Sequence, residues 1–131
     1  MDIIINVNAP EPVYEQIVRQ IHEGVKSGSL KPGAPLPPVR QLASDLVLNR
    51  NTVARAYKTL EEQGVIRTAG RKGTFVRRDA AAEVTRQKAG RAQRTVRHVI
   101  EALISDGLSR KEISDLFNNA LSLETGKGSR P

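Results

Sequence analysis

Two stripes of apolar residues with helical spacing, separated by a three-residue joint, lie at the centre of the chain. The first stripe holds Leu42, Ala43 and Leu46, and the second holds Val53, Ala56, Tyr57 and Leu60. Two such helices must bury their facing stripes against each other. The joint, residues 47–49, is too short for a flexible loop, and Asn49 is suited to cap the second helix with its side-chain oxygen. Residues 38–63 therefore predict a helix-turn-helix.

The flanking segments complete a small domain. Apolar residues at four-residue steps predict a helix from Pro12 to Gly28, and the Pro- and Gly-rich segment 28–37 predicts a turn in which Leu30 and Leu36 anchor into the core. The β-branched run 3–5 is either an edge strand or an arm laid on the core. Two β-rich runs on either side of a Gly-flanked basic tip predict a hairpin that must pack against the helices. Together these elements predict a mainly α fold with a small β-wing, a winged helix-turn-helix.

The last third of the chain predicts two amphipathic helices, the second of them started by a capping box of Ser109 and Glu112. We expect a DNA-binding domain at residues 1–78, a helical dimerisation tail at 79–123 and a disordered segment at 124–131. The apolar faces of the tail helices exceed what either can cover for the other, which predicts a homodimer. The residues expected at its contact are Val96, Val99, Ile100, Leu103, Ile104, Ile113, Leu116, Phe117, Ala120 and Leu121.

Charge is concentrated in the central segment. The chain carries 21 Lys and Arg against 14 Asp and Glu, a net charge of +7. Counted along the sequence, residues 1–30 hold 2 basic and 4 acidic groups, residues 31–78 hold 10 and 3, and residues 79–131 hold 9 and 7, giving −2, +7 and +2. An excess of this size on the helix-turn-helix segment indicates a polyanionic partner.

Other classes of function find little support in the sequence. There is no Cys, and the two histidines, His22 and His98, fall in separate segments, so we expect neither a metal site nor a cofactor. No constellation of Ser, His and acid is visible, so we expect no enzyme. No apolar run approaches the length of a membrane span and no signal peptide is present, so we expect a cytoplasmic protein without membrane contact.

Donor-rich side chains gather at the start of the second helix of the helix-turn-helix. Arg can fork onto O6 and N7 of guanine, Asn can pair with N6 and N7 of adenine, and a helix N-terminus favours phosphate. The alternative for the start of this helix is an ordinary polar face exposed to solvent, and the alternative for the tip of the hairpin is a solvated turn that happens to be basic. We expect DNA contacts from Asn49, Arg50, Asn51, Thr52 and Arg55, and contacts to phosphate or the minor groove from Arg71 and Lys72 at the hairpin tip.

Residues Pro12 to Val76 resemble the winged-helix domain of the GntR family of bacterial transcriptional regulators. The resemblance rests on an LPxxR-LA element, the NTVARAY helix and the GTFV strand, in the expected order. The two-helix tail resembles the YtrA-type subfamily, whose members dimerise through it. The resemblance implies a homodimeric DNA-binding regulator, commonly a repressor. By matching position it implies DNA contacts at Arg40, Arg50, Asn51, Thr52 and Arg55 and a wing tip at Gly70, Arg71, Lys72 and Gly73.

Two residues depart from the family pattern. Pro38 replaces a small polar residue able to cap the first helix of the helix-turn-helix, so a capping bond is lost. Val47 stands where the turn usually has Gly. Because positive φ strains a β-branched residue, the turn either adopts negative φ or carries a local cost of about 1 kcal/mol or more.

These observations predict binding to a palindromic double-stranded DNA operator, with half-sites about 10 base pairs apart or a multiple of that. The alternative is a winged-helix module for non-sequence-specific nucleic-acid or protein contact, which predicts steep salt dependence with little sequence preference. An unidentified small-molecule effector would have two places to bind, between the tail helices or near residues 78–95. The cations near residues 78–95 have three possible roles: they bind an anion, they add contacts to DNA phosphates, or they form a solvated helix face.

Overall fold

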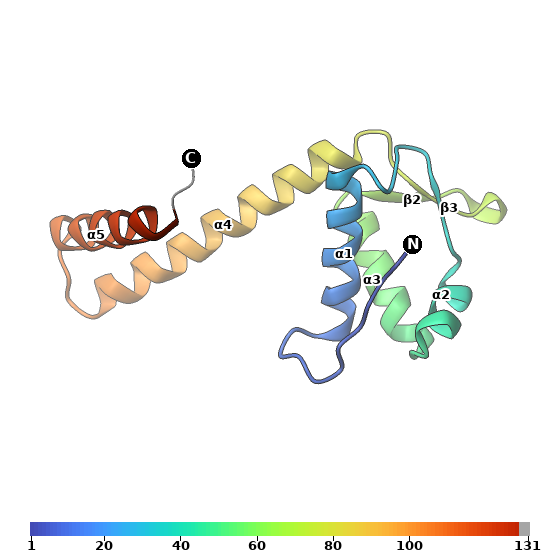
Figure 1. Ribbon diagram of the computed structural model, residues 1–131, viewed down its shortest axis with the longest axis horizontal. Helices are drawn as coiled ribbons and strands as arrows, with labels where there is room; N and C mark the ends of the chain where they lie inside the picture. The colour runs from blue at the N-terminus through green and yellow to red at the C-terminus, as the bar shows by residue number, and fades with distance from the viewer. Residues whose placement is uncertain (129–131) are drawn as a thin grey trace. The chain divides into compact units, whose positions relative to one another are not determined.

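The computed structural model describes residues 1–128, with side chains described as far as Glu124. It divides into a first unit, Met1–Lys88, and a second unit that begins at Ala89. Three helices and a small sheet in the first unit confirm the winged helix expected from the sequence (Figure 1). In chain order the elements are α1 (Val13–Ser27), β1 (Pro35–Leu36), α2 (Val39–Leu46), α3 (Arg50–Glu62), β2 (Ile66–Thr68), the 3₁₀ turn η1 (Gly70–Lys72), β3 (Thr74–Val76), α4 (Ala80–Ser105) and α5 (Arg110–Gly128).

The core of the first unit lies where α1 and α3 pack side by side (Figure 1). Two contacts fix their register: Arg55 stacks on the ring of Tyr14, and His22 Nε2 lies 2.7 Å from Gln63 Oε1. In both pairs the residues are 41 positions apart, so the two helices run in the same direction. The first turn of α1 therefore lies beside the N-terminal half of α3.

The wing is a three-stranded antiparallel sheet in the order β1-β3-β2. The two-stranded hairpin expected from the sequence is thus incomplete, because Pro35 pairs with Phe75 and so adds a strand to the free side of β3. Val76 extends this pairing: its N–H donates to Ala34 O and its carbonyl accepts from Gly33 N–H, both at 2.8 Å. The base of the wing is therefore held from both sides.

Residues 3–6 form an arm on α1 and not a strand. The side-chain amide of Gln20 accepts from the N–H of Ile4 at 2.9 Å and donates to its carbonyl at 2.7 Å. The buried side chain of Gln16 makes the same pair of bonds to Asn6, at 2.9 and 2.8 Å. Two glutamines one helical turn apart thus take the place of a neighbouring strand, and the arm buries Ile3.

The first unit extends further than the domain 1–78 expected from the sequence. Ala80 and Val84, in the first turns of α4, are buried in the core of the first unit, which continues to Lys88. Small apolar residues one turn apart give the start of α4 a packing face of its own. Helix α4 therefore contributes to both units.

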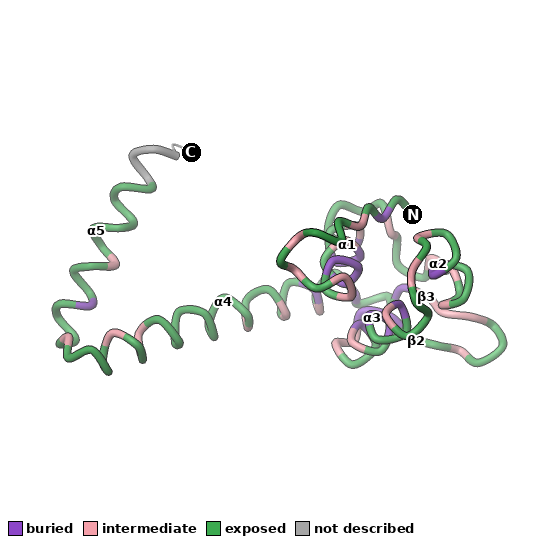
Figure 2. Tube along the Cα trace, turned by 90° about the horizontal axis from the view of Figure 1, so that it is seen from below, coloured by how far each residue is buried: buried purple, intermediate pink, exposed green. Residues whose placement is uncertain are grey.

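The second unit is a helical hairpin whose apolar residues are mostly exposed (Figure 2). The predicted capping box is present, since Ser109 N–H donates to Glu112 Oε1 at 2.8 Å and Glu112 N–H donates to Ser109 Oγ at 3.1 Å. Hydrogen bonds from the backbone N–H and hydroxyl of Ser109 lower the pKa of Glu112. Ile113 is buried within the hairpin, whereas Val96, Val99, Ile104, Leu116 and Leu121 are exposed.

Helix α5 continues to Gly128 and so includes residues 124–128 of the segment 124–131 that the sequence predicts to be disordered. Once a helix is started, each further residue adds a hydrogen bond, and no proline occurs before position 131 to stop it. The rest of that segment, 129–131, lies outside the described residues. Within the described part of the chain, no helix combines the length and the apolar character needed to cross a bilayer.

Candidate nucleic-acid interface

The turn between α2 and α3 is built on a left-handed residue. Val47 has φ 55° and ψ 52°, so of the two outcomes expected for this position the strained one is found. The next residue, Leu48, donates its N–H to Ala43 O at 2.9 Å and closes the turn. The side chain of Val47 is 89% exposed, so burial does little to offset its backbone strain.

The caps of the two helices differ as expected. Pro38 at the start of α2 makes no side-chain capping bond, which confirms the loss expected from its sequence. Asn49 caps α3, because its Oδ1 accepts from Asn51 N–H at 2.7 Å. The side-chain oxygen of Asn49 is therefore used within the protein, and its amide NH₂ is the part left for an outside partner.

Tyr57 ties α3 to the residues that lead into α2. Its hydroxyl donates to Pro37 O at 2.6 Å, and burial raises the pKa of Tyr57, which keeps the hydroxyl protonated and able to donate. This bond fixes the start of α2, and with it Arg40 in the first turn, relative to α3.

The expected base-reading residues lie in the first turn of α2 and the first turn of α3. Arg40, Arg50 and Asn51 are exposed, while Thr52 is half-buried. Within residues 1–124, neither Arg40 nor Arg50 takes part in an ion pair. Their guanidinium groups are therefore available for a partner from outside.

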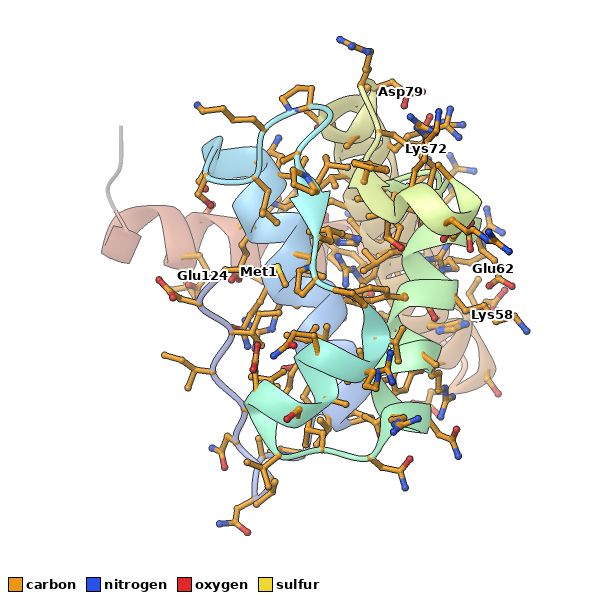
Figure 3. The ribbon with its side chains drawn as sticks, turned by 90° about the vertical axis from the view of Figure 1, so that its right-hand side faces the viewer. Met1, Lys58, Glu62, Lys72, Asp79 and Glu124 are labelled. Atoms are coloured by element: carbon orange, nitrogen blue, oxygen red, sulfur yellow. The ribbon has the colours of Figure 1, made fainter. Side chains whose placement is uncertain are left out.

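The wing tip presents two exposed cations, Arg71 and Lys72, on the tight turn η1. Gly70 (φ 57°) and Gly73 (φ 109°) adopt backbone conformations that favour glycine. The turn therefore needs a glycine on each side of the two cations. Figure 3 shows Lys72 on the same side of the unit as Lys58 of α3. Lys58 is exposed seven residues after Asn51, a helical spacing that places both on one face but was not used in the sequence prediction.

Arg55 is held by α1. Its Cζ lies 3.8 Å from the centroid of the Tyr14 ring. Helix α1 holds none of the DNA-contact residues expected from the sequence, yet Tyr14 at its start contacts one of them. Among the residues with described side chains, no group of three or more His, Asp or Glu is arranged to hold a metal ion.

Comparison with known proteins places the first unit among bacterial regulators. The model of the family "Bacterial regulatory proteins, gntR family" matches residues 13–76. The chain is 44% identical over 78 residues to the HTH-type transcriptional repressor YtrA of Bacillus subtilis, with 60% of each chain covered. It spans about three fifths of the length of this repressor and of the HTH-type transcriptional regulator Rv1152 of Mycobacterium tuberculosis, to which it is 46% identical over 74 residues.

Two solved structures extend the comparison. A transcriptional regulator from Oenococcus oeni is 37% identical with a TM-score of 0.64, covering 89% of this chain and 97% of that one. YtrA from Sulfolobus acidocaldarius, described as a GntR-family transcription factor, is 37% identical with a TM-score of 0.57, covering 70% and 96%. The likeness to the first of these extends beyond residues 1–88 and so includes part of the helical tail.

Proposed function

The chain belongs to the gntR family of bacterial regulatory proteins, and on that premise we propose that it is a transcriptional regulator that binds double-stranded DNA with sequence specificity. One observation carries the proposal. The first turn of α3 presents the exposed side chains of Arg50 and Asn51, and Arg50 has no ion-pair partner within residues 1–124. A guanidinium and an amide are the groups that recognise guanine and adenine in the major groove.

The remaining residues have distinct roles in the proposed complex. Arg50, Asn51 and Thr52, with Arg40 from α2, contact base edges. Arg71 and Lys72 on the wing contact phosphates or the minor groove, and backbone amides at the helix starts add phosphate contacts. Phosphate contacts set affinity and its salt dependence, while base contacts set sequence preference.

The tail supports a homodimer as the binding form. Val99 and Leu116 are 43% and 48% exposed, and the groove between α4 and α5 is lined by Ile100, Ile104 and Phe117. A second copy of the chain, presenting the same apolar residues, would cover this surface. A symmetric dimer would carry two copies of α3 and bind a palindromic operator, and repression would follow from occupying promoter DNA.

Arg50→Ala tests the proposal. A duplex selected from random-sequence DNA by the wild-type protein is compared with a scrambled duplex of the same composition. If Arg50 reads guanine, the variant loses about 1–3 kcal/mol of binding free energy on the selected duplex and much less on the scrambled one. Lys31→Ala, which removes an exposed cation outside the proposed surface, is the matched control. Equal losses on both duplexes would reduce Arg50 to a phosphate contact.

A second candidate is general binding to polyanions. Its support is the stretch from residue 84 to residue 100, which contains five cations and no acid. That function predicts a wild-type protein with steep salt dependence and no preference between the selected and scrambled duplexes. The Arg50 experiment therefore separates the two candidates.

A further inference from the structure

The stack of Arg55 on Tyr14 joins an expected DNA-binding side chain to a helix that carries none of the others. The guanidinium carbon lies 3.8 Å from the ring centroid, a distance at which the negative face of the ring attracts the cation. Tyr14 is half-buried at the start of α1, while Arg55 is exposed on α3. The fold thus fixes the ring of Tyr14, and the guanidinium group of Arg55 covers the side of the ring that faces solvent.

Stacking occupies the face of the guanidinium and leaves its edges available. The N–H donors of Arg point outward in the plane of the group. Within residues 1–124, Arg55 forms no ion pair and its side chain forms no hydrogen bond. Two acids of the α1 region, Glu11 and Glu23, are paired with Arg19 at 3.0 and 3.2 Å. The N–H donors of Arg55 are therefore unpaired within the part of the chain whose side chains are described.

The stack also lies near the end of α3 that carries the expected base-reading residues. Because α1 and α3 run in the same direction, Tyr14 is next to the half of α3 that begins with Arg50. Arg55 follows Asn51 by four residues, about one helical turn, so the two exposed side chains share a face of α3. Both can then meet the same stretch of duplex.

We propose that Tyr14 is a positioning residue for DNA recognition: its ring restricts the rotamers of Arg55 and presents the donor edge of the guanidinium to the duplex. The proposal rests on the DNA-binding function proposed above. Fixing a long, flexible side chain before binding lowers the entropy lost when the contact forms. Helix α1 is then part of the recognition apparatus as well as of the core.

A double-mutant cycle tests the proposal on the duplex selected by the wild-type protein. Arg55→Ala should raise Kd about tenfold or more, as expected for loss of a bidentate contact. Tyr14→Leu should raise Kd about 3- to 10-fold, the range of a cation–π contact. In the Arg55→Ala background, Tyr14→Leu should change Kd less than about twofold, because the side chain that it positions is gone.

Two further variants separate positioning from folding. Tyr14→Phe keeps the aromatic face and should restore Kd to within about twofold of wild type, since the stack needs the ring and not the hydroxyl. Val18→Ala removes buried volume from the next turn of α1 and should lower the midpoint of urea unfolding without raising Kd at a temperature where the protein is folded.

The outcomes distinguish the two proposals. A wild-type protein that selects no sequence would overturn the proposed function before Tyr14 came into question. If the wild type does select a sequence, two results overturn the role of Tyr14 alone. One is a Tyr14→Leu protein that binds like wild type, and the other is the same fold-loss from Tyr14→Leu with and without Arg55.

Discussion

Val47 shows how one residue in the turn of a helix-turn-helix can act against the stability of the fold. It is the non-glycine residue with positive φ among residues 1–128, and its side chain is almost fully exposed. Left-handed backbone costs an L-residue roughly 1–2 kcal/mol, and β-branching restricts the side chain further. The cost is tolerated because the neighbouring bonds from Leu48 to Ala43 and from Asn51 to Asn49 fix the turn on both sides.

Val47→Gly should stabilise the protein by about 1 kcal/mol, since relief of the left-handed strain exceeds the added entropy of the unfolded chain. The measurement is urea unfolding followed by circular dichroism. Val47→Ala is the control, because Ala keeps a Cβ and so most of the strain. A Gly variant no more stable than the Ala variant would show that the turn carries no strain that glycine can relieve.

At the scale of elements, the parts predicted correctly are those with local signals. Helical periodicity predicted α1, α2 and α3, and with them the exposure of Arg50 and Asn51, because neighbours three and four residues apart determine a helix face. The strand β1 has two residues, one of them Pro35, and carries no alternating pattern to detect. The stack of Arg55 on Tyr14 joins residues 41 positions apart, and no local pattern encodes such a contact.

The N-terminal arm gives a prediction at the same scale. Gln20→Met keeps the side-chain volume but removes both hydrogen bonds to Ile4, each worth about 0.5–1.5 kcal/mol. The amide hydrogen of Ile4 should then exchange about tenfold faster or more. Gln16→Met should do the same for Asn6, so each variant serves as the control for the other. Unchanged exchange at both amides would mean that apolar contacts alone hold the arm.

For the molecule as a whole, the two units have different proposed roles, DNA binding and association of two copies of the chain. The first unit holds every residue assigned to DNA, and the second holds the exposed apolar residues assigned to a second copy of the chain. In the hairpin, Ile113 is already buried by the chain itself, so Val99 and Leu116 are the more informative positions for testing association.

Leu116→Asp should convert the proposed dimer to a monomer, because a buried carboxylate without a partner is strongly unfavourable. Sedimentation equilibrium reports the mass, and binding to the selected duplex should weaken at least tenfold, since two linked heads bind together more tightly than either alone. Ser122→Asp adds the same charge to the same helix at an exposed polar position and should leave the mass unchanged. Loss of the dimer in both variants would point to general charge repulsion.

The three-stranded sheet has a further consequence for how the protein behaves when concentrated. Its central strand, β3, pairs with a neighbouring strand on each side, and the edge strands β1 and β2 have only two and three residues. Edges this short offer too few free backbone groups to template the addition of foreign strands, which is the usual start of fibrous aggregation. Self-association at high concentration should therefore be reversible and side-chain-driven, and dilution should undo it.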